Sequence, residues 1–528
     1  MCQKAYTAST IQAVEAPTVQ DENYDGYLMQ RAAHRLALVT LEALAKTSSG
    51  KVLLLVGKGN NGADTLFAGA QIQEHGYSVE AILSEGSAHE EGLEAFQRVG
   101  GVIIDSLPSA STDYAVIIDG ILGTGARGRL RGKSAEIVSA LCRWLEQRER
   151  PRVIACDIPS GIDATTGQIH RPVLKADETV TFIGYKVPFL MPAEHWCGKI
   201  TLDDLGLGSK MTEEHSALSR LDDAQLAEFF PTPTALDQKY SRGVVGMICG
   251  SNDYPGAALI SVRAALNAGV GMVRYCGTNE LNFHIHLQCP EAVCTTAPPN
   301  DLHVQAWAAG PGATGESREE ALMHAILAPE PAVLDAASLE LAARHIGMNG
   351  PLGAHKILTP HAGELETLLQ WINSLDSQRW GEITGEEAPS RTEIEENSLY
   401  WVQVAAQLTG STVLLKGATT LIASPDGRVL SVRGETSWMA TAGSGDTLTG
   451  ILGSILAQAV GKLQQQQENQ STKLDYPQDF FSHVAACAAR VHNLAALAVH
   501  DGVAAGPVPP SLVAAHVPAV ITQLLNAR

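Results

Sequence analysis

Aromatic and basic side chains are both scarce in this chain of 528 residues. Aromatics make up 5% of the sequence while glycine reaches 49 residues, a balance that favours an α/β design with many tight turns over an all-β sandwich. Lysine and arginine number 37 against 57 acidic residues, so the formal net charge is -20. Long-range attraction to nucleic acid or an anionic membrane is therefore not expected, and a phosphate ligand needs local backbone donors, a few cations or a metal ion.

Paired cysteines and long hydrophobic runs are missing as well. The nine cysteines are scattered, their count is odd and no CxxC pair occurs, which argues against a zinc site and against a disulfide framework. No uninterrupted apolar run is long enough to span a bilayer, and residues 1–20 lack the basic-then-apolar order of a signal peptide. These features predict a cytoplasmic protein with reduced, buried thiols.

Two successive series of apolar strands and helices occupy the chain, as expected for a length that exceeds one ordinary core. In the first series, strand, glycine turn and helix alternate over residues 51–64, 65–76, 78–83, 114–128 and 152–163. Strands without polar alternation are typical of a parallel sheet that helices cover on both faces. This half is therefore predicted to be a Rossmann-like three-layer sandwich, and the fold class of the whole chain to be α/β.

A polar stretch at 208–225 leads to the second series, which is α/β as well and ends in helical stretches at 446–460 and 480–499. The predicted domains are residues 1–215 and 216–528. Within the second domain, the acidic stretch 373–397 and the glutamine-rich stretch 462–479 are predicted to be mobile surface loops.

Polar motifs follow the ends of the predicted strands, where ligands of open parallel sheets bind. In the first half, GKGNNGAD (57–64) and DGILGTGARGRLRG (119–132) offer backbone amides and arginines to a phosphate, and DIPSGID (157–163) adds acids and a hydroxyl. Ordinary turn chemistry explains any one of these loops equally well. The three loops together favour a binding site.

The second half carries MATAGSGDTLTG at 439–450, in which small residues precede a single acid. The backbone of Thr441 to Gly445 can surround an anion, and Asp446 then opens a helix whose dipole stabilises its carboxylate. A transferring phosphoryl group needs such donors, and the attacking hydroxyl needs a base. The alternative is that Asp446 is only a helix cap behind a glycine turn. LTPHAGE (358–364) and LLKGATT (414–420) add His361, Glu364 and Lys416.

These motifs carry a resemblance that covers nearly the whole chain. The first half resembles NAD(P)HX epimerase domains through GKGNNGAD, DGILGTGARG, DIPSGID and TFIGYKVPFL. The second half resembles NAD(P)HX dehydratase domains of the ribokinase-like superfamily through GSNDYPGAA, AAGPG, VLDAASL, LTPHAGE, VLLKGATT and ATAGSGDTLTG. Their order is similar to that of bacterial bifunctional NAD(P)H-hydrate repair enzymes. The resemblance implies interconversion of the R and S hydrates of NADH and NADPH, and dehydration of the S hydrate with ADP to NAD(P)H, AMP and phosphate.

The resemblance also implies site residues in the epimerase domain. The residues expected to bind the hydrate are Asn60, Asn61, Gly62, Ala63, Asp64, Gly123, Thr124, Gly125, Ala126, Arg127, Gly128, Arg129 and Asp157. A potassium ion is implied at Asn61, Asp119 and Ser160, whose amide, carboxylate and hydroxyl oxygens suit a hard cation. Asp64 and Lys186 are the candidates for acid and base.

For the dehydratase domain, the resemblance implies hydrate contacts from Ala257, Gly312, His361 and Asp446, with Asp446 as the base that takes the proton of the substrate hydroxyl. The residues implied to hold the co-substrate ADP, with magnesium, are Lys416, Gly417, Ala418, Thr419, Thr420 and Gly445. The expected partners are these small molecules and further copies of the chain in a homo-oligomer, without nucleic acid or membrane.

The chain departs from the family pattern at three positions. Ala63 and Thr65 stand where relatives usually have glycines, and the β-branched Thr65 is expected to resist a positive φ. Ala337 stands where relatives often have a second acid, although Asp335 is retained. We expect activity to survive because Asp446 and the anion loop are intact.

Two other functions fit parts of the sequence. A ribokinase-like kinase for a small molecule such as a vitamin alcohol, with the first domain as an accessory, would use the same anion loop and base. A nucleotide-sensing protein with degenerate sites would not need the base at Asp446. Activity on NADHX distinguishes the repair enzyme from both.

Overall fold

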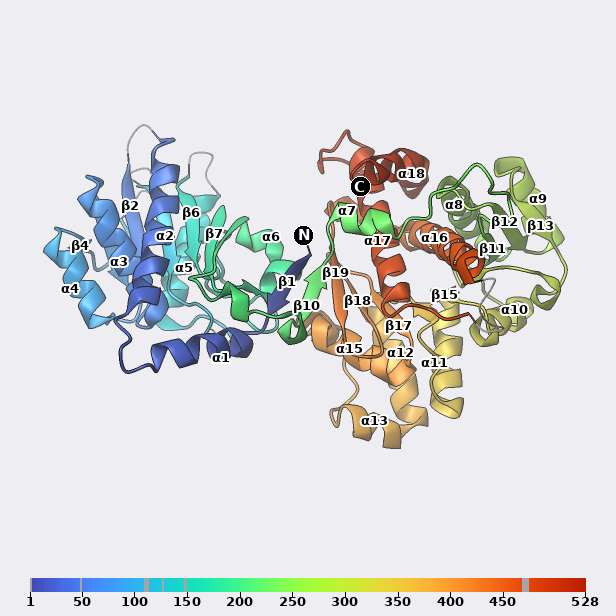
Figure 1. Ribbon diagram of the computed structural model, residues 1–528, viewed down its shortest axis with the longest axis horizontal. Coiled ribbons are helices and arrows are strands. Elements are labelled where there is room, and N and C mark those ends of the chain that lie inside the picture. The colour runs from blue at the N-terminus through green and yellow to red at the C-terminus, as the bar shows by residue number, and fades with distance from the viewer. Residues whose placement is uncertain (1, 48–49, 109–113, 126–127, 147–149, 468–473) are drawn as a thin grey trace. The chain divides into compact units, whose positions relative to one another are not determined.

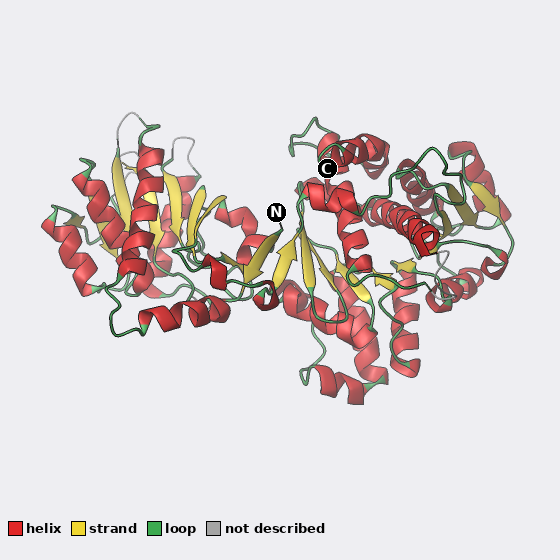
Figure 2. Cartoon of the chain, in the orientation of Figure 1, coloured by secondary structure: helices red, strands yellow, loops and turns green. Residues whose placement is uncertain are grey.

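The computed structural model describes residues 2–47, 50–108, 114–125, 128–146, 150–467 and 474–528, and its contacts divide the chain into two compact units. One unit holds Gln3–Ser219 and the other holds Arg220–Arg528. Both are α/β units in which helices surround strands, so the predicted fold class is confirmed (Figures 1 and 2). Within the described ranges, no helix combines the length and hydropathy needed to cross a membrane.

The first unit is built on a parallel sheet with the strand order β4-β3-β2-β5-β6-β7-β9. The strands are β2 (Lys51–Val56), β3 (Val79–Leu83), β4 (Val102–Ile103), β5 (Tyr114–Gly120), β6 (Arg152–Cys156), β7 (Glu178–Phe182) and β9 (Lys199–Asp203). The helices are α1 (Ala8–Val19), α2 (Tyr27–Leu44), α3 (Asn60–Glu74), α4 (Glu90–Arg98), α5 (Gly132–Leu145) and α6 (Glu194–Cys197). Outside this sheet, β1 (Gln3–Tyr6) pairs in parallel with β8 (Tyr185–Lys186).

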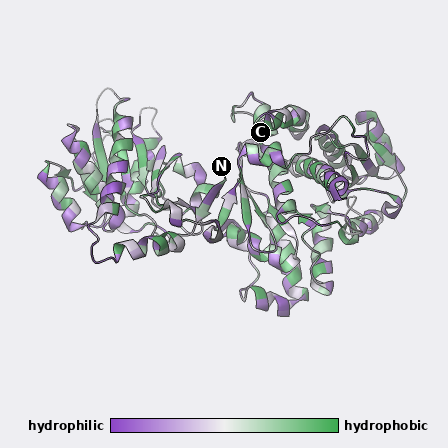
Figure 3. Ribbon diagram, viewed as in Figure 1, coloured by the Kyte–Doolittle hydropathy of each residue, from purple (hydrophilic) through white to green (hydrophobic). Residues whose placement is uncertain are grey.

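Alternate side chains of the central strand β2 pack into two different cores. Leu54 packs in one core with Leu66 of α3, whereas Leu53 packs in the other with Leu141 of α5. Because successive strand side chains point to opposite faces, this division places helices on both faces of the sheet. The central strands β2 and β5 are accordingly buried and mostly hydrophobic (Figure 3). The predicted three-layer arrangement of this unit is confirmed.

The second unit contains a sheet with the strand order β13-β12-β11-β14-β15-β16-β17-β18-β19, parallel as far as β17 and antiparallel from there. The strands are β11 (Val244–Ile248), β12 (Met272–Cys276), β13 (Val293–Thr295), β14 (Ala306–Ala309), β15 (Ala332–Leu334), β16 (Lys356–Leu358), β17 (Thr412–Leu415), β18 (Thr419–Ala423) and β19 (Val429–Arg433). A further short strand, β10 (Leu218–Arg220), lies at the junction of the units.

Helices pack against this sheet along its whole width. They are α7 (Asp223–Glu228), α8 (Pro255–Asn267), α9 (Asn279–Gln288), α10 (Glu316–Leu327), α11 (Ala337–Asn349), α12 (Ala362–Leu375), α13 (Ser377–Ile383), α14 (Arg391–Glu396), α15 (Ser398–Thr409), α16 (Ser444–Gln467), α17 (Phe480–Ala498) and α18 (Pro510–Leu525). The long helix α16 is buried over most of its length and packs against α8, α17 and strand β14. Its amino end is thereby fixed close to the ends of the central strands.

The two stretches predicted to be mobile loops contain helices instead. Residues 373–397 include α13 and α14, so the loop prediction was wrong there. Ser390 forms a capping box with Glu393 at the start of α14, and Trp380 and Ile394 are buried. In the glutamine-rich stretch, α16 continues to Gln467, while residues 468–473 lie outside the described residues.

Candidate functional site

Three strand ends meet in the first unit around a buried carboxylate. Asp157 directly follows β6 and adopts a left-handed backbone with φ of 66°, which few residues other than glycine and asparagine tolerate. Its side chain accepts hydrogen bonds from the backbone N–H of Thr124 at 2.9 Å, from the hydroxyl of Thr181 at 3.2 Å, and from the Thr124 hydroxyl. These hydrogen bonds hold Asp157 in a strained backbone conformation at the carboxyl edge of the sheet. Strained residues of this kind are typical of functional sites.

Lys186 is the counter-ion of Asp157 and is 1% exposed. Its ammonium group donates to Asp157, to the hydroxyl of Thr181 at 2.8 Å and to the carbonyl of Phe182 at 2.8 Å. Burial raises the pKa of Asp157, but the charge and hydrogen bonds of Lys186, together with Thr124, outweigh it and hold that pKa below its usual value. Asp157 and Lys186 therefore form an ionised pair, and the three ammonium hydrogens of Lys186 are all donated within the protein.

A second buried carboxylate, Asp119, lies at the end of the neighbouring strand β5. It accepts hydrogen bonds from the backbone N–H of Ser160 at 2.8 Å and from the Ser160 hydroxyl at 2.6 Å. Asn61 donates through its amide nitrogen to the carbonyl of Leu122 at 3.0 Å, which leaves its amide oxygen close to Gly123. The three residues expected to hold potassium thus bring amide, carboxylate and hydroxyl oxygens to adjacent loops, a donor set that fits a hard cation.

Asp64 lies one turn inside α3 and is partly buried. Burial raises the pKa of its carboxyl well above the usual value, and the negative charges of Asp157 and Glu15 raise it further. No side chain among the described residues donates a hydrogen bond to it. The raised pKa of Asp64 favours its protonated form, as a general acid requires.

The loop predicted at GKGNNGAD is in fact the beginning of α3, because the helix starts at Asn60. Its first turn runs so close to the preceding strand end that a Cβ on Gly62 would lie 1.9 Å from the carbonyl oxygen of Gly57. Gly59 caps the helix without a side-chain hydrogen bond, so the free amides of the first turn are open to an anion.

Thr65 and Ala63 are accommodated without strain. Both are buried in α3, and neither has a positive φ, so the expected resistance of Thr65 to a positive φ does not come into play. The Thr65 hydroxyl donates to the carbonyl of Asn61 at 2.8 Å, and its side chain fills the space beside Gly120.

This packing predicts that restoring glycine at position 65 harms the protein. Thr65→Gly should lower the free energy of unfolding by about 2 kcal/mol, since it removes a buried side chain and places glycine inside a helix. Calorimetry checks this value, with Thr65→Ser as the matched control that keeps the hydroxyl. A variant that is as stable as the parent and epimerises faster would contradict this account of the loop.

The remaining predicted residues of the first site lie on the loop after β5. Gly123 and Thr124 are partly buried beside Asn61 and Asp157, Gly125 and Arg129 are exposed, and Gly128 has a φ of 69°. Ala126 and Arg127 lie outside the described residues. The described part of this loop faces the same strand ends as Asp157 and Asp64.

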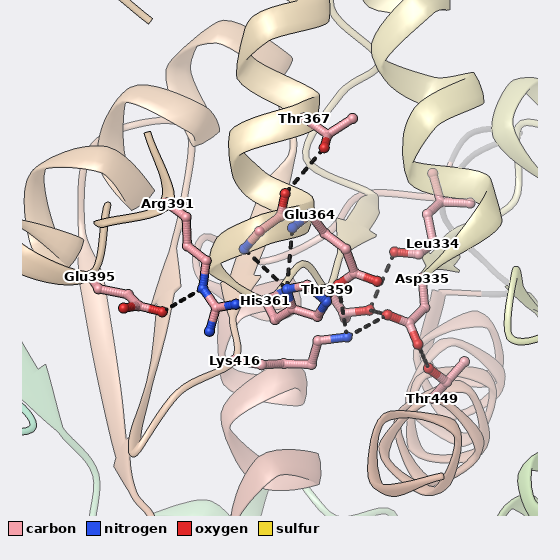
Figure 4. Close-up of polar contacts among 11 residues, drawn as sticks. Leu334, Asp335, Thr359, His361, Glu364, Thr367, Arg391, Glu395, Lys416 and Thr449 are labelled. Carbon is pink, nitrogen blue, oxygen red and sulfur yellow. Dashed lines mark hydrogen bonds and ion pairs between the residues drawn. The ribbon is translucent and has the colours of Figure 1, made fainter. Parts of the chain in front are cut away.

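In the second unit, the carboxylate of Asp335 organises the edge of the sheet (Figure 4). Asp335 follows β15, is 2% exposed, and accepts hydrogen bonds from Lys416 at 2.8 Å and from the hydroxyls of Thr359 and Thr449 at 2.9 Å each. Lys416 also contacts Glu364 at 3.3 Å. Burial raises the pKa of Asp335, but Lys416 and the two hydroxyls outweigh it, so that this carboxyl stays ionised.

Asp446 lies next to this ion pair, in the first turn of α16. Its pKa is raised to about 6, chiefly by burial and then by the charge of Asp335, while Lys416 opposes the shift. A Cβ on the preceding Gly445 would lie 3.5 Å from the ammonium of Lys416 and 3.6 Å from the Asp335 carboxylate. A carboxylate with a pKa near 6, a cation and open helix amides therefore share one small region, which suits proton removal beside a phosphoryl group.

His361 caps α12 and has a defined hydrogen-bonding state. Its Nδ1 accepts from the backbone N–H groups of Gly363 at 3.1 Å and Glu364 at 3.2 Å, while Glu364 accepts from the His361 backbone at 2.8 Å. An Nδ1 that accepts leaves the hydrogen on Nε2 in the neutral ring. The half-exposed His361 ring therefore has a donor at Nε2, which lies 3.6 Å from the Glu364 carboxylate.

The other predicted residues of the second site fall into two groups. Gly312, with a φ of 60°, is so close to Ala257 of α8 that a Cβ on it would lie 2.7 Å from the Ala257 methyl group. Gly417 and Ala418 are exposed in the β17–β18 turn, whereas Thr419 and Thr420 are buried in β18. Ala337 begins α11, two residues after Asp335.

Both units are similar to known protein families. Residues 245–517 match the family model described as NAD(P)H-hydrate dehydratase, and residues 26–187 match the model described as YjeF-related protein N-terminus. The bifunctional NAD(P)H-hydrate repair enzyme Nnr of Mycobacterium tuberculosis is 36% identical over 458 residues, which cover 86% of this chain and 89% of that protein. The chain belongs to the family of bifunctional NAD(P)H-hydrate repair enzymes.

A second member of the repair-enzyme family is similar over most of its length. The Corynebacterium glutamicum enzyme is 31% identical, with 93% of this chain and 92% of that protein covered. Among solved structures, the Bacillus subtilis ADP/ATP-dependent NAD(P)H-hydrate dehydratase covers 58% of this chain with 22% identity and a TM-score of 0.45. The resemblance inferred from the sequence motifs is confirmed by the family matches.

Several residues of the repair-enzyme sites were not found by sequence reasoning. Thr359 and Thr449 hold Asp335 although Thr449 is 114 residues away in the chain, and Thr181 holds both Asp157 and Lys186. Glu15, from the N-terminal helix, adds its charge to the acid cluster of the first unit. Threonine is common in strands for reasons of packing alone, and a buried threonine in a helix is equally unremarkable in sequence. No local pattern therefore distinguished these residues.

Proposed function

We propose that this chain repairs hydrated NADH and NADPH, with an epimerase in residues 1–215 and an ADP-dependent dehydratase in residues 216–528. The observation that carries the proposal is Asp446, whose pKa is raised to about 6 beside Lys416, Asp335 and the open amides of α16. The family membership supports the same reaction, because its relatives are named repair enzymes. The kinase and sensor alternatives have no comparable support.

In the dehydratase step, Asp446 takes the proton of the substrate hydroxyl while the hydroxyl oxygen attacks the β-phosphorus of ADP. The bond to AMP breaks, and the amides around Gly445 together with Lys416 bind the phosphoryl oxygens as charge develops. The phosphorylated oxygen is a good leaving group, so phosphate departs with its bonding electrons as the ring nitrogen supplies an electron pair. Loss of the neighbouring ring proton then restores the double bond.

Binding of the hydrate is assigned to Ala257, Gly312 and His361, whose Nε2–H can donate to an acceptor on the nicotinamide. Nucleotide binding is assigned to the β17–β18 turn with the first two residues of β18, together residues 416–420, and to Gly445. A magnesium ion with ADP would compensate the phosphate charges in this acidic region.

In the epimerase step, Asp64 is proposed as the acid that acts on the substrate hydroxyl, because burial and neighbouring negative charge raise its pKa well above the usual value. Lys186 contributes by keeping Asp157 ionised, since its own hydrogens are all donated within the protein. Asn61, Asp119 and Ser160 would hold potassium, which supplies positive charge next to the binding loops. A homo-oligomer and a cytoplasmic location remain predictions.

The experiment that tests the dehydratase is a stoichiometry measurement with purified S-NADHX and ADP. One NADH, one AMP and one phosphate should form per hydrate consumed. Release of phosphate without NADH, or phosphorylation of a vitamin alcohol with ATP and no action on NADHX, would favour the kinase alternative.

The pH dependence of the dehydratase should show the ionisation of Asp446. A base must be deprotonated to act, so kcat/KM for S-NADHX should fall tenfold per pH unit below about 6. Asp335→Asn removes the charge that raises the pKa of Asp446, so this limb should move to lower pH. If the acidic fall of kcat/KM stays at the same pH in Asp335→Asn, the group that titrates is not Asp446.

Gly445→Ala is predicted to weaken nucleotide binding without harm to folding. The added methyl group makes only ordinary contacts at 3.5 and 3.6 Å and the φ at this position is not positive, so the thermal midpoint should not fall. The same methyl group covers the first-turn amides, so KM for ADP should rise at least about tenfold, through loss of hydrogen bonds to a charged group. Gly381→Ala, at an open helical position, is the matched control.

A further inference from the structure

Glu15 is a carboxylate that reaches the acid cluster of the first unit from outside all of the recognised motifs. It lies on α1, before the residues 26–187 that match the epimerase-side family model. Its side chain is partly buried, yet it accepts no hydrogen bond from the residues that the structure describes.

The geometry of α1 places Glu15 on the side of the helix that faces the start of β8. Strand β1 pairs with β8 so that Tyr6 stands opposite Lys186, and α1 begins two residues after Tyr6. Ile11 packs its Cδ1 atom 3.3 Å from the position of a Cβ on Gly184, which precedes β8. Glu15 is four residues after Ile11 and therefore lies on the same face of the helix, one turn further on.

The electrostatics of the cluster agree with this placement. Burial raises the pKa of Glu15, the charge of Asp157 raises it further, and Lys186 opposes the shift. Glu15 in turn raises the pKa of Asp64, and it contributes after burial to a raised pKa of Tyr24, the other titratable group that faces it. The pKa values of Glu15 and Asp64 are thus both raised while that of Asp157 is lowered, and carboxyls with pKa values set apart suit acid and base roles in one site.

We propose that Glu15 is a catalytic acid–base residue of the epimerase and works as the partner of Asp64. The inference rests on the proposed epimerase function of this unit. Epimerisation at the hydroxyl-bearing carbon needs its C–O bond to break and re-form on the other face. One carboxylic acid protonates the hydroxyl, water leaves with the bonding electrons, and the ring nitrogen supplies an electron pair to form an iminium. Water then adds to the opposite face and gives its proton to the other residue, which enters the step as a carboxylate, so atoms and charge balance.

The test is the rate at which Glu15→Gln converts R-NADHX, followed by NADH formation with excess ADP and the chain's own dehydratase. We expect the epimerase kcat to fall about 100-fold or more toward the spontaneous rate, because glutamine cannot exchange the proton. KM, the dehydratase rate on S-NADHX and the thermal midpoint should stay unchanged, since glutamine has nearly the same shape. Glu15→Asp should retain part of the activity, and Glu22→Gln, at an exposed position, should retain all of it.

The outcomes separate this inference from the function on which it rests. A parent chain that cannot epimerise R-NADHX would overturn the proposed epimerase itself. A parent chain that epimerises, with Glu15→Gln equally fast, would overturn the role of Glu15 alone. A loss of activity that follows a lower thermal midpoint, with Glu15→Asp no better than Glu15→Gln, would show a structural role and overturn it as well.

Discussion

Asp446→Asn should reduce the dehydratase kcat by about 10²- to 10⁴-fold, the usual contribution of a general base, while epimerisation continues. Asparagine keeps the shape of the side chain but cannot take the proton of the substrate hydroxyl. The assay of the dehydratase is NADH formation from S-NADHX with ADP. The epimerase activity of the same variant is measured separately, as the conversion of R-NADHX into S-NADHX. Asp475→Asn, an exposed substitution in the same unit, should leave both activities unchanged.

The same substitution should make the protein more stable. The folded pKa of Asp446 is about 6 and the unfolded value is near 3.8, so the ionised carboxylate costs free energy above pH 6. Asparagine removes that cost, which solvent screening at a partly exposed site reduces to roughly 1 kcal/mol. Lower activity together with higher stability is expected when a residue serves function and reduces the stability of the fold. A variant that is less stable and fully active would contradict the assignment.

Lys186→Met should destabilise the first unit by about 3–5 kcal/mol and abolish epimerisation, because it leaves the buried Asp157 without its counter-ion. Calorimetry measures the loss, and the dehydratase activity reports whether the second unit stays folded. The exposed Lys175→Met is the matched control.

The double variant Lys186→Met with Asp157→Asn distinguishes charge pairing from packing. Removal of both charges should recover a large part of the lost stability but none of the epimerase activity, since the ionised carboxylate is gone. If Lys186→Met alone unfolds at the temperature of the control, Lys186 does not hold the site together.

The positions of the principal acids could be predicted from the sequence because of one geometric rule. Residues that follow parallel strands lie at one edge of the sheet, and this rule placed Asp119, Asp157 and Asp335 correctly at strand ends. Apolar runs without alternation likewise predicted sheets with helices on both faces. These inferences needed only local pattern and the common direction of the strands.

The predictions that were wrong, and the contacts that were missed, depend on residues distant in sequence or on weak local signals. The start of α3 at Asn60 was taken for a loop, because glycine and asparagine are typical of turns and Gly59 makes no side-chain cap. The acidic stretch 373–397 was predicted to be a loop because its many charged residues are typical of exposed segments. The helix caps and the buried Trp380 within it were not recognised. The bond from Thr449 to Asp335 depends on the packing of α16 and has no local signal.

The measurement that tests the central claim most directly is the recovery of reduced-nicotinamide absorbance from a mixture of R- and S-NADHX with ADP. The account predicts complete recovery, without a slow phase limited by spontaneous epimerisation, because both units are active. Recovery of the S fraction alone would contradict the epimerase site, and no recovery with ADP would contradict the repair function as a whole.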